Sequence, residues 1–212
     1  NTEIACPESH PNSASGSTSQ DQCYKICDDG YGVNGTNDSY AQYGETCEPY
    51  YMTIQYSCDD CDGGDAPTAP IRCEYGTECI LPENTYTKPG YKFDKWNVEC
   101  QGCVAKQRIV IEQPSGSTTS SVQMFAGEDI SQFISATNTG TSFTISPVWT
   151  ECTAGYYCPG YTGDYEQIKC PVDYTSAYDL KLKPTSPAGA TSSNDCYIEK
   201  PCPNGTGTGG PG

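Results

Sequence analysis

The sequence predicts a mostly β, disulfide-rich chain that is divided into several small modules. Cysteine is abundant, with 15 in 212 residues, as in secreted chains that are held together by disulfides. Ile, Leu, Val and Phe make up only about 12% of the chain, which is too little for a large apolar core. Glycine and proline, at 22 and 16 residues, separate short runs of β-branched and aromatic residues, which favour strands over helices.

Residues 1–66 are expected to form one or more cysteine-rich modules, and part of this region is repeated near the other end of the chain. Residues 12–24 read NSASGSTSQDQCY, and residues 185–197 read TSPAGATSSNDCY. Gly16 and Gly189 each stand seven residues before a Cys-Tyr pair. Coincidence between two Ser/Thr-rich loops is the alternative, but the matched positions favour an internal repeat. We therefore expect residues 151–203 to form a cysteine-rich module that repeats the N-terminal one.

Residues 67–150 are predicted to form one small β-rich domain. This region holds both tryptophans and all four phenylalanines. Strands are predicted at five runs of β-branched and aromatic residues, which lie at 79–81, 91–96, 108–111, 122–125 and 142–145. Acidic residues precede Ile130, Phe133 and Ile134 at helical spacing, so one short helical turn is expected there. The domain is accordingly a small α+β unit, with Phe93, Trp96 and Trp149 as its small core.

The same region resembles the internalin-type B repeat of modular surface proteins. That family combines an apolar-Pro pair, a Pro-Gly-aromatic-x-Phe-x-x-Trp motif, a Gly-led acidic stretch and a final strand ending in Trp. Residues 75–96, YGTECILPENTYTKPGYKFDKW, and the closing ISPVW at 145–149 carry the likeness. The matching positions are Leu81-Pro82, Pro89-Gly90-Tyr91, Phe93, Trp96, Gly127 and Trp149. The resemblance implies a β-grasp-like domain. The chain departs from the pattern in its cysteines and in a Ser/Thr insertion at 114–121.

The flanking regions resemble the cysteine-rich modules of receptor-type and epidermal-growth-factor-like proteins. CPESHPNSASGSTSQDQC and CTAGYYCPGYTG carry the Cys-Pro, Gly-Tyr-Tyr-Cys and Ser-x-x-Gly-x-Thr elements of such modules. Together with the B-repeat likeness, this implies an extended, modular, secreted polypeptide. Residues 204–212 are glycine-rich and are expected to be a linker or tail.

All of the cysteines are candidates for disulfides, and their spacing leaves the pairing open. They are Cys6, Cys23, Cys27, Cys47, Cys58, Cys61, Cys73, Cys79, Cys100, Cys103, Cys152, Cys158, Cys170, Cys196 and Cys202. Two C-x-x-C units could share a zinc ion, but nearly forty residues separate them, where a zinc ribbon expects about 15–20. We therefore expect no metal. Because 15 is odd, at least one sulfur is free, bound to another chain, or paired with a residue outside this sequence.

Charge and composition exclude several function classes. The formal net charge of −16 repels phosphate backbones, so no nucleic-acid partner is expected. No apolar run reaches the length of about 18 residues that spans a bilayer. The single histidine, His10, leaves no material for a Ser/His/Asp triad, so we expect no enzyme, no catalytic residue and no cofactor. Acidic clusters at 28–29 and 59–65 could bind calcium, but their spacing is not that of an EF-hand, and solvated loops are the favoured interpretation.

Glycosylation and tyrosine contacts remain open alternatives. Asn34, Asn37 and Asn204 each begin an N-x-Ser/Thr acceptor sequence, which predicts attached glycans if the source is a eukaryote. The other interpretation is that they are polar turn residues. The 17 tyrosines are expected mainly to pack over disulfides, and otherwise to contact other subunits or ligands.

These observations predict a non-enzymatic structural protein that is extracellular or at the cell surface. It would be a disulfide-linked subunit or repeat segment of a filament, appendage or layer. Its partners would be copies of itself or further repeats of the same chain. The alternative is an adhesin or receptor-stalk module that binds a protein or a glycan.

Overall fold

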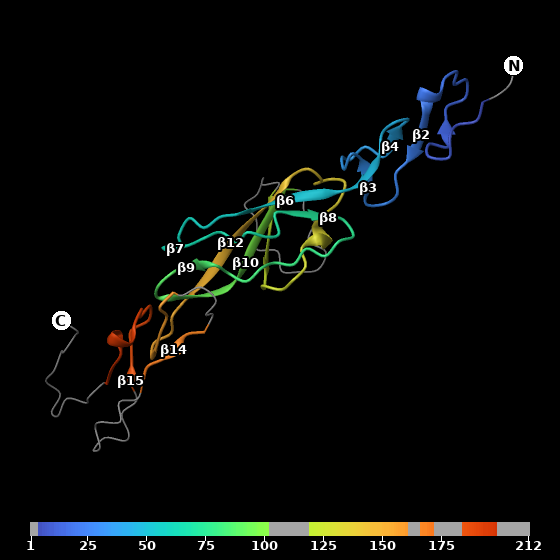
Figure 1. The fold of residues 1–212 in the computed structure, drawn as a ribbon. Coiled ribbons are helices and arrows are strands. Elements are labelled where there is room, and N and C mark those ends of the chain that lie inside the picture. The colour runs from blue at the N-terminus through green and yellow to red at the C-terminus, as the bar shows by residue number, and fades with distance from the viewer. Residues whose placement is uncertain (1–3, 102–118, 161–165, 172–183, 199–212) are drawn as a thin grey trace, which may run out of the picture. The chain divides into compact units, whose positions relative to one another are not determined.

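A computed structural model describes residues 4–101, 119–160, 166–171 and 184–198 (Figure 1). Within these ranges the chain is mostly β, and its only helical segments are the 3₁₀ turns η1 (Gln20–Gln22), η2 (Ser131–Phe133) and η3 (Ser193–Asp195). This confirms the predicted mostly β, disulfide-rich fold class. The predicted strand at 108–111 and the tail at 204–212 lie outside the described residues.

The strands are short except in one sheet. They are β1 (Asn12–Ser13), β2 (Cys23–Ile26), β3 (Tyr31–Val33), β4 (Tyr40–Gln42), β5 (Cys47–Pro49), β6 (Tyr51–Tyr56), β7 (Gly63–Gly64), β8 (Arg72–Glu74), β9 (Tyr86–Thr87), β10 (Tyr91–Gln101), β11 (Thr119–Met124), β12 (Ser142–Glu151), β13 (Tyr156–Tyr157), β14 (Ile168–Lys169), β15 (Pro184–Thr185) and β16 (Tyr197–Ile198). One sheet has five strands in the order β11-β10-β12-β6-β8, and another has three in the order β1-β2-β4.

The chain forms two compact units, each made of segments that are distant in sequence. The first comprises Asn1–Cys58, Ala66–Asn84 and Lys95–Val148, and the second comprises Asp59–Asp65, Thr85–Asp94 and Trp149–Gly212. The division at 66, 150 and 203 stays a prediction. One strand lies on the other side of the predicted boundary from its sheet. β6 precedes residue 66 but belongs to the same sheet as β8, β10, β11 and β12. The boundary expected at residue 66 therefore does not separate this sheet from the preceding chain.

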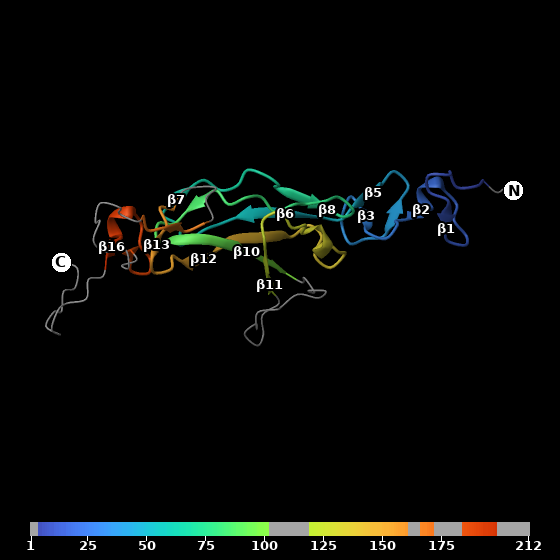
Figure 2. The same cartoon turned by 90° about the horizontal axis from the view of Figure 1, so that it is seen from below.

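The five-stranded sheet combines parallel and antiparallel pairs. β12 runs parallel to β6, with Ser142 opposite Thr53, whereas β8 is antiparallel to β6 and β11 is antiparallel to β10. Side chains alternate between buried and exposed along β6, so that Met52 and Ile54 point into the core. Figure 2 shows β10, β12 and β6 together with the edge strand β11.

Trp96 is the largest buried side chain of the first unit. It has no solvent-exposed surface, and its Nε1–H donates to the carbonyl oxygen of Pro82 at 2.8 Å. This bond satisfies the one polar group of the indole. The other large side chains that are almost completely buried in this unit are Met52, Leu81, Val98, Met124, Ile130, Phe143 and Ile145.

The three aromatic residues expected to share one core are divided between the two units. Phe93 is buried and meets the ring of Trp149 edge-on, with the ring centroids 6.2 Å apart, in the second unit. Trp96 belongs to the first unit. Phe93 and Trp96 stand three residues apart on β10, and because side chains alternate along a strand, they lie on opposite faces of it.

The predicted strands at 91–96, 122–125 and 142–145 are confirmed as parts of β10, β11 and β12, with β11 ending at Met124. The run at 79–81 is different, because it forms only an isolated bridge between Ile80 and Asp129. The short helical turn is confirmed as η2.

The two halves of the sequence repeat have the same local structure. β1 pairs with β2 so that Asn12 lies opposite Tyr24, and β15 pairs with β16 so that Thr185 lies opposite Tyr197. In each copy the loop contains a glycine in the left-handed region, which side chains with a Cβ rarely adopt. In each copy the cysteine of the Cys-Tyr pair is bonded to the cysteine of the preceding Cys-Pro pair, with 17 residues of separation in the first copy and 26 in the second.

Candidate functional site

Every cysteine in the described residues is disulfide-bonded. The pairs that the structure defines are Cys6–Cys23, Cys27–Cys47, Cys73–Cys79, Cys152–Cys158 and Cys170–Cys196. Cys58, Cys61 and Cys100 are bonded as well. Cys103 and Cys202 lie outside the described residues. Cross-links therefore reach both compact units, where they limit the freedom of the unfolded chain.

The oxidised sulfurs bear directly on the zinc alternative. Cys58, Cys61 and Cys100 belong to the two C-x-x-C units and are disulfide-bonded, whereas zinc is bound by thiolates. Among the acidic residues of the second cluster, Asp60 forms an ion pair with Lys88. In the first cluster, Asp28 and Asp29 are exposed, which agrees with the solvated-loop interpretation.

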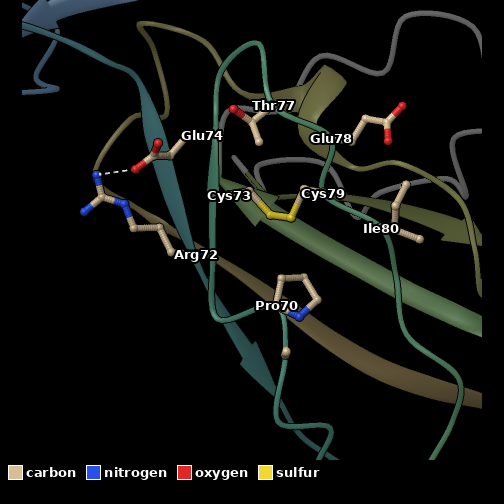
Figure 3. A pocket seen from close by; sticks show the side chains of 9 residues that line it. Pro70, Arg72, Cys73, Glu74, Thr77, Glu78, Cys79 and Ile80 are labelled. Atoms are coloured by element: carbon tan, nitrogen blue, oxygen red, sulfur yellow. Dashed lines mark ion pairs between the residues drawn. A yellow bond between two sulfur atoms is a disulfide. The ribbon is translucent and has the colours of Figure 1, made fainter.

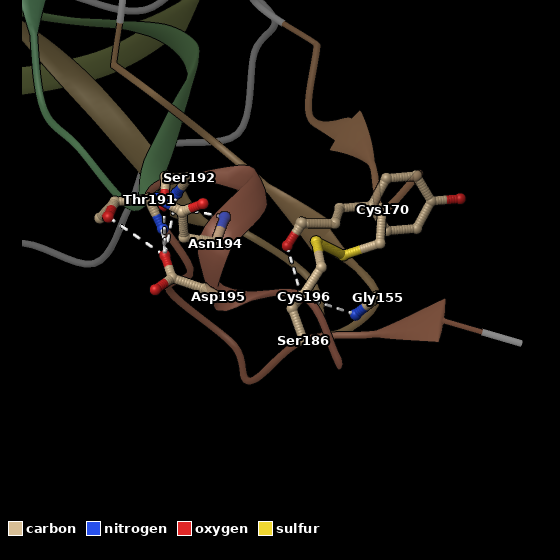
Figure 4. The surroundings of a disulfide bond; sticks show 9 residues. Gly155, Cys170, Ser186, Thr191, Ser192, Asn194, Asp195 and Cys196 are labelled. Carbon is tan, nitrogen blue, oxygen red and sulfur yellow. Dashed lines mark hydrogen bonds between the residues drawn. A yellow bond between two sulfur atoms is a disulfide. The ribbon is translucent and has the colours of Figure 1, made fainter. Parts of the chain in front are cut away.

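Ser186 and Asp195 organise the backbone around the disulfide between Cys170 and Cys196 (Figure 4). The Ser186 hydroxyl donates to the Tyr156 carbonyl at 2.6 Å and accepts the Gly155 N–H at 3.0 Å. Asp195 accepts the N–H groups of Thr191 and Ser192, the two residues directly before the η3 turn. These bonds hold the pKa of Asp195 below its ordinary value of 3.8.

Asp129 organises the η2 turn in the first unit. Its Oδ1 accepts the N–H of Cys79 at 2.9 Å and the N–H of Ser131 at 2.9 Å, and its Oδ2 accepts the Ser131 hydroxyl. Desolvation raises the pKa of this carboxyl, but the hydrogen bonds together outweigh it and hold the pKa below the ordinary value. Asp129 thus joins the disulfide-bonded 73–79 loop to η2.

A groove of about 540 Å³ lies beside β8 (Figure 3). The disulfide between Cys73 and Cys79 crosses between its two walls. The residues that line the groove are Ala69, Pro70, Arg72, Cys73, Glu74, Thr77, Glu78, Cys79 and Ile80. Among the titratable groups here are two glutamates and one arginine, and Arg72 pairs with Glu74 at 3.0 Å.

The edge of β8 is partly covered by the chain that follows it. The Tyr75 N–H donates to the carbonyl of Tyr50, directly before β6, and the Ile71 carbonyl accepts the N–H of Ile54 in β6. By alternation, the backbone groups of Arg72 and Glu74 point away from the sheet. The Thr77 N–H then donates to the Glu74 carbonyl at 3.2 Å. The chain that follows β8 therefore occupies part of this edge. The edge strand itself carries two charged side chains, Arg72 and Glu74.

The edge of β4 is closed by two carboxylates. The Tyr40 N–H donates to Asp38 Oδ1 at 3.0 Å, and the Gln42 N–H donates to Glu45 Oε2 at 2.8 Å. β2 pairs with the other side of β4, with Ala41 opposite Lys25. The N–H groups of β4 that point away from β2 are already bonded to these carboxylates. This edge is therefore a poor template for a strand of another molecule.

Exposed aromatic and apolar side chains gather on one face of β2 and β4. Tyr24 and Tyr40 meet edge-on, with centroids 5.8 Å apart, and Ile26 lies opposite Tyr40. Tyr40 is 53% exposed and Ile26 is 52% exposed. Not all tyrosines cover disulfides, therefore, and this aromatic face (Tyr24, Ile26 and Tyr40) is open to solvent.

Two of the three glycosylation candidates lie close together on one turn. Asn34 and Asn37 are both exposed between β3 and β4, where a sugar would meet solvent. Asn204 lies outside the described residues.

Sequence reasoning missed β6 and the carboxylates that close β4. The alternating run YMTIQY at 51–56 was a usable signal for a strand with one buried face. The roles of Asp38 and Glu45 depend on turn geometry that no residue pattern specifies.

No helix in the described ranges is both long and apolar enough to cross a bilayer. Comparison with known proteins found no matching family model, no matching curated protein and no matching solved structure.

Proposed function

We propose that the chain is a non-enzymatic structural protein of the extracellular space or cell surface. It would serve as a disulfide-linked subunit or repeat segment of a filament, appendage or layer. The observation that carries this proposal is that all thirteen cysteines in the described ranges are in disulfides. Disulfides persist in oxidising compartments and are rare in the cytosol.

In this role the chain would act as a rigid scaffold that is held by its cross-links. Small modules survive without a large core because each contains its own cross-links, as Cys6–Cys23 does in one copy of the repeat and Cys170–Cys196 does in the other. A turn that recurs near both ends of the sequence supports an arrangement of modules in series. The likenesses to B repeats and to cysteine-rich modules agree with this proposal. The predicted glycans at Asn34 and Asn37 would suit a protein outside the cell.

A binding module is the second candidate, and the aromatic face of β2 and β4 favours it. Rigid tyrosine rings with exposed hydroxyls are common at recognition surfaces. In this case the chain would act as an adhesin or a receptor stalk, and Tyr40 and Ile26 would contact a protein or a glycan.

Negative-stain electron microscopy of the native material separates the two candidates. A structural subunit is expected to show ordered fibres or sheets without any added partner, and a stalk is expected to remain monomeric. Electrophoresis with and without reductant supplies the second readout, because the odd cysteine count allows a bond between chains. Thiol titration that finds most sulfurs reduced in the native material would contradict the proposal.

A further inference from the structure

The second copy of the repeated turn, residues 186–190, is docked on a disulfide-closed loop within the second unit. This cystine loop runs from Cys152 to Cys158. The Gly189 N–H donates to the Cys152 carbonyl, and the Cys158 N–H donates to the Ala190 carbonyl, each at 2.9 Å. These two bonds attach the second turn to both ends of the cystine loop.

The side chains of the second turn complete this contact (Figure 4). The Ser186 hydroxyl accepts the N–H of Gly155 and donates to the carbonyl of Tyr156, in the middle of the cystine loop. Docking leaves Ser186 only 2% exposed and Ala190 only 4% exposed. The second turn is therefore bound through a hydroxyl, a backbone N–H, a backbone carbonyl and one small buried side chain.

The first copy of the turn, residues 13–17, keeps the groups that make this contact. The corresponding positions are Ser13 for Ser186, Gly16 for Gly189, and Ser17 for Ala190. Gly16 and Gly189 both lie in the left-handed region, at φ values of +87° and +73°, so the backbones turn in the same way. The pairing of β1 with β2 and of β15 with β16 places both turns at the same point of a hairpin.

The first turn has no such partner in the part of the chain that the structure describes. Ser13 and Gly16 are exposed, and beyond its chain neighbours no atom lies within 4 Å of the place where a Cβ on Gly16 would stand. Within the described ranges no hydrogen bond reaches the Ser13 hydroxyl, the Gly16 N–H or the Ser17 carbonyl. The same binding groups are thus docked in one copy and open to solvent in the other.

The one change among the docking positions is compatible with burial. Ser17 replaces Ala190, but its hydroxyl donates to the Ala14 carbonyl at 2.7 Å inside its own turn, so burial would leave no unpaired polar group. Neither residues 12–19 nor the cystine loop contain a charged residue. The net charge of −16 therefore places no like charges directly against each other in this contact.

We propose that the first turn docks on a cystine loop of the same kind in a neighbouring repeat, through the contacts that the second turn makes within this chain. This inference rests on the proposed function, because it names the contact between modules arranged in series. The Ser13 hydroxyl, the Gly16 N–H and the Ser17 carbonyl would supply the bonds. The contact joins two different surfaces, so it can be repeated along an array. The cystine loop described above is already filled by the second turn, so wild-type copies are not expected to associate in this way.

A full-chain variant with an open cystine loop supplies the partner for the test. Ser186→Ala with Gly189→Val removes two bonds to the loop and places a Cβ where the backbone favours glycine, 3.0 Å from a carboxylate oxygen of Glu151. Mixed with isotope-labelled wild-type chain, this open-loop variant is expected to form a complex in sedimentation velocity. Hydrogen exchange at Gly16 of the labelled chain is expected to slow in the complex.

Two serines of the first turn provide a matched pair of substitutions in the wild-type partner. Ser13→Ala removes the hydroxyl that would make two bonds and is expected to weaken the complex by about tenfold. Ser15→Ala is the control, because Ser15 stands at the position of Ala188, which is exposed in the docked turn. Equal binding by the two variants would overturn the proposal.

A cyclised peptide tests the contact without altering the second unit. The peptide of residues 150–160, closed by its disulfide, is expected to shift the amide resonance of Gly16 when it is titrated into the wild-type chain. Gly44, another exposed left-handed glycine of the first unit, is expected not to shift. If Gly16 does not respond to the peptide and no complex forms with the open-loop variant, the inference is wrong. Ordered fibres of the native material would in that case still support the proposed function.

Discussion

Gln22 and Asp195 occupy the same place in two copies of one turn. The side chain of each accepts hydrogen bonds from the backbone N–H groups three and four residues before it. Gln22 Oε1 accepts from Thr18 and Ser19, and Asp195 Oδ2 accepts from Thr191 and Ser192. The repeat therefore preserves an acceptor at this position while its chemical group changes from an amide to a carboxylate.

Gln22→Ala is expected to destabilise the N-terminal copy by about 1 kcal/mol, because it removes the acceptor for the two N–H groups directly before η1. Gln22→Glu keeps an acceptor and is expected to cost less. Hydrogen exchange at Thr18 and Ser19 is the measurement, and both amides should exchange faster in the alanine variant. Gln20→Ala, an exposed change in the same turn, is the control. Equal exchange in Gln22→Ala and Gln20→Ala would refute the role of the side chain.

The two disulfides that the structure defines in the second unit are expected to differ in their contributions. Cys170 and Cys196 are separated by 26 residues, and Cys152 and Cys158 are separated by 6. The loop-entropy model gives about 3.5 kcal/mol for the longer loop and about 2 kcal/mol for the shorter one. Replacing each pair by alanines and comparing urea midpoints tests this order. A larger loss from the 152–158 pair would show that loop entropy does not set the ranking.

Trp96→Phe is expected to destabilise the first unit by about 2 kcal/mol, since it leaves a cavity and removes the donor for the Pro82 carbonyl. Trp149→Phe is the matched comparison. Trp149 Nε1 is buried and has no hydrogen-bond partner among the described residues, so this variant loses no bond and is expected to cost less. Differential scanning calorimetry measures both, because each substitution removes the tryptophan that would report on its own unit. A Trp149→Phe variant as unstable as Trp96→Phe would contradict the importance of the bond to Pro82.

The fold class and most of the long strands could be predicted from local patterns. The runs that became β10, β11 and β12 alternate apolar and polar residues, and this period of two is a local property. The η2 turn was predictable for the same reason, because Ile130 and Ile134 are spaced to share one helical face. The repeat was visible because both copies keep the glycine and the Cys-Tyr pair at the same spacing.

Long-range pairing could not be predicted in this way. β6 pairs in parallel with β12, and Thr53 and Ser142 meet although 89 residues separate them. No local pattern encodes such a partner. The position of Trp96 and Phe93 in separate units likewise depends on which strands flank β10. The closed edge of β4 arises from Asp38 and Glu45 in turns whose backbone geometry decides where the carboxylates point.

Acid is expected to weaken the first unit through Asp129. The folded-state pKa of Asp129 lies below the ordinary value of 3.8. The hydrogen bonds that its carboxylate accepts therefore contribute their full stability at pH values above 3.8. This contribution is lost as the pH falls from 3.8 through the lowered folded-state pKa. Urea unfolding at a series of pH values is the measurement. Asp129→Asn is expected to flatten the dependence in this window, and an unchanged slope in that variant would assign the acid sensitivity to other carboxylates.

The carboxylates that close β4 are expected to keep this edge from associating. The double variant Asp38→Ala, Glu45→Ala frees the N–H groups of Tyr40 and Gln42, and an edge with free donors beside the exposed Tyr40 ring is a template for strand addition. Association through this edge, beyond any that the wild type shows, is expected in sedimentation velocity. Removing two negative charges also lowers repulsion between copies, so the control must remove two charges elsewhere. Glu8→Ala with Asp29→Ala does this at exposed positions and is expected to add no new contact. Only the first double variant exposes backbone N–H donors, whereas both remove two negative charges. Equal association of the two variants would therefore show that net charge, and not closure of the edge, limits this contact.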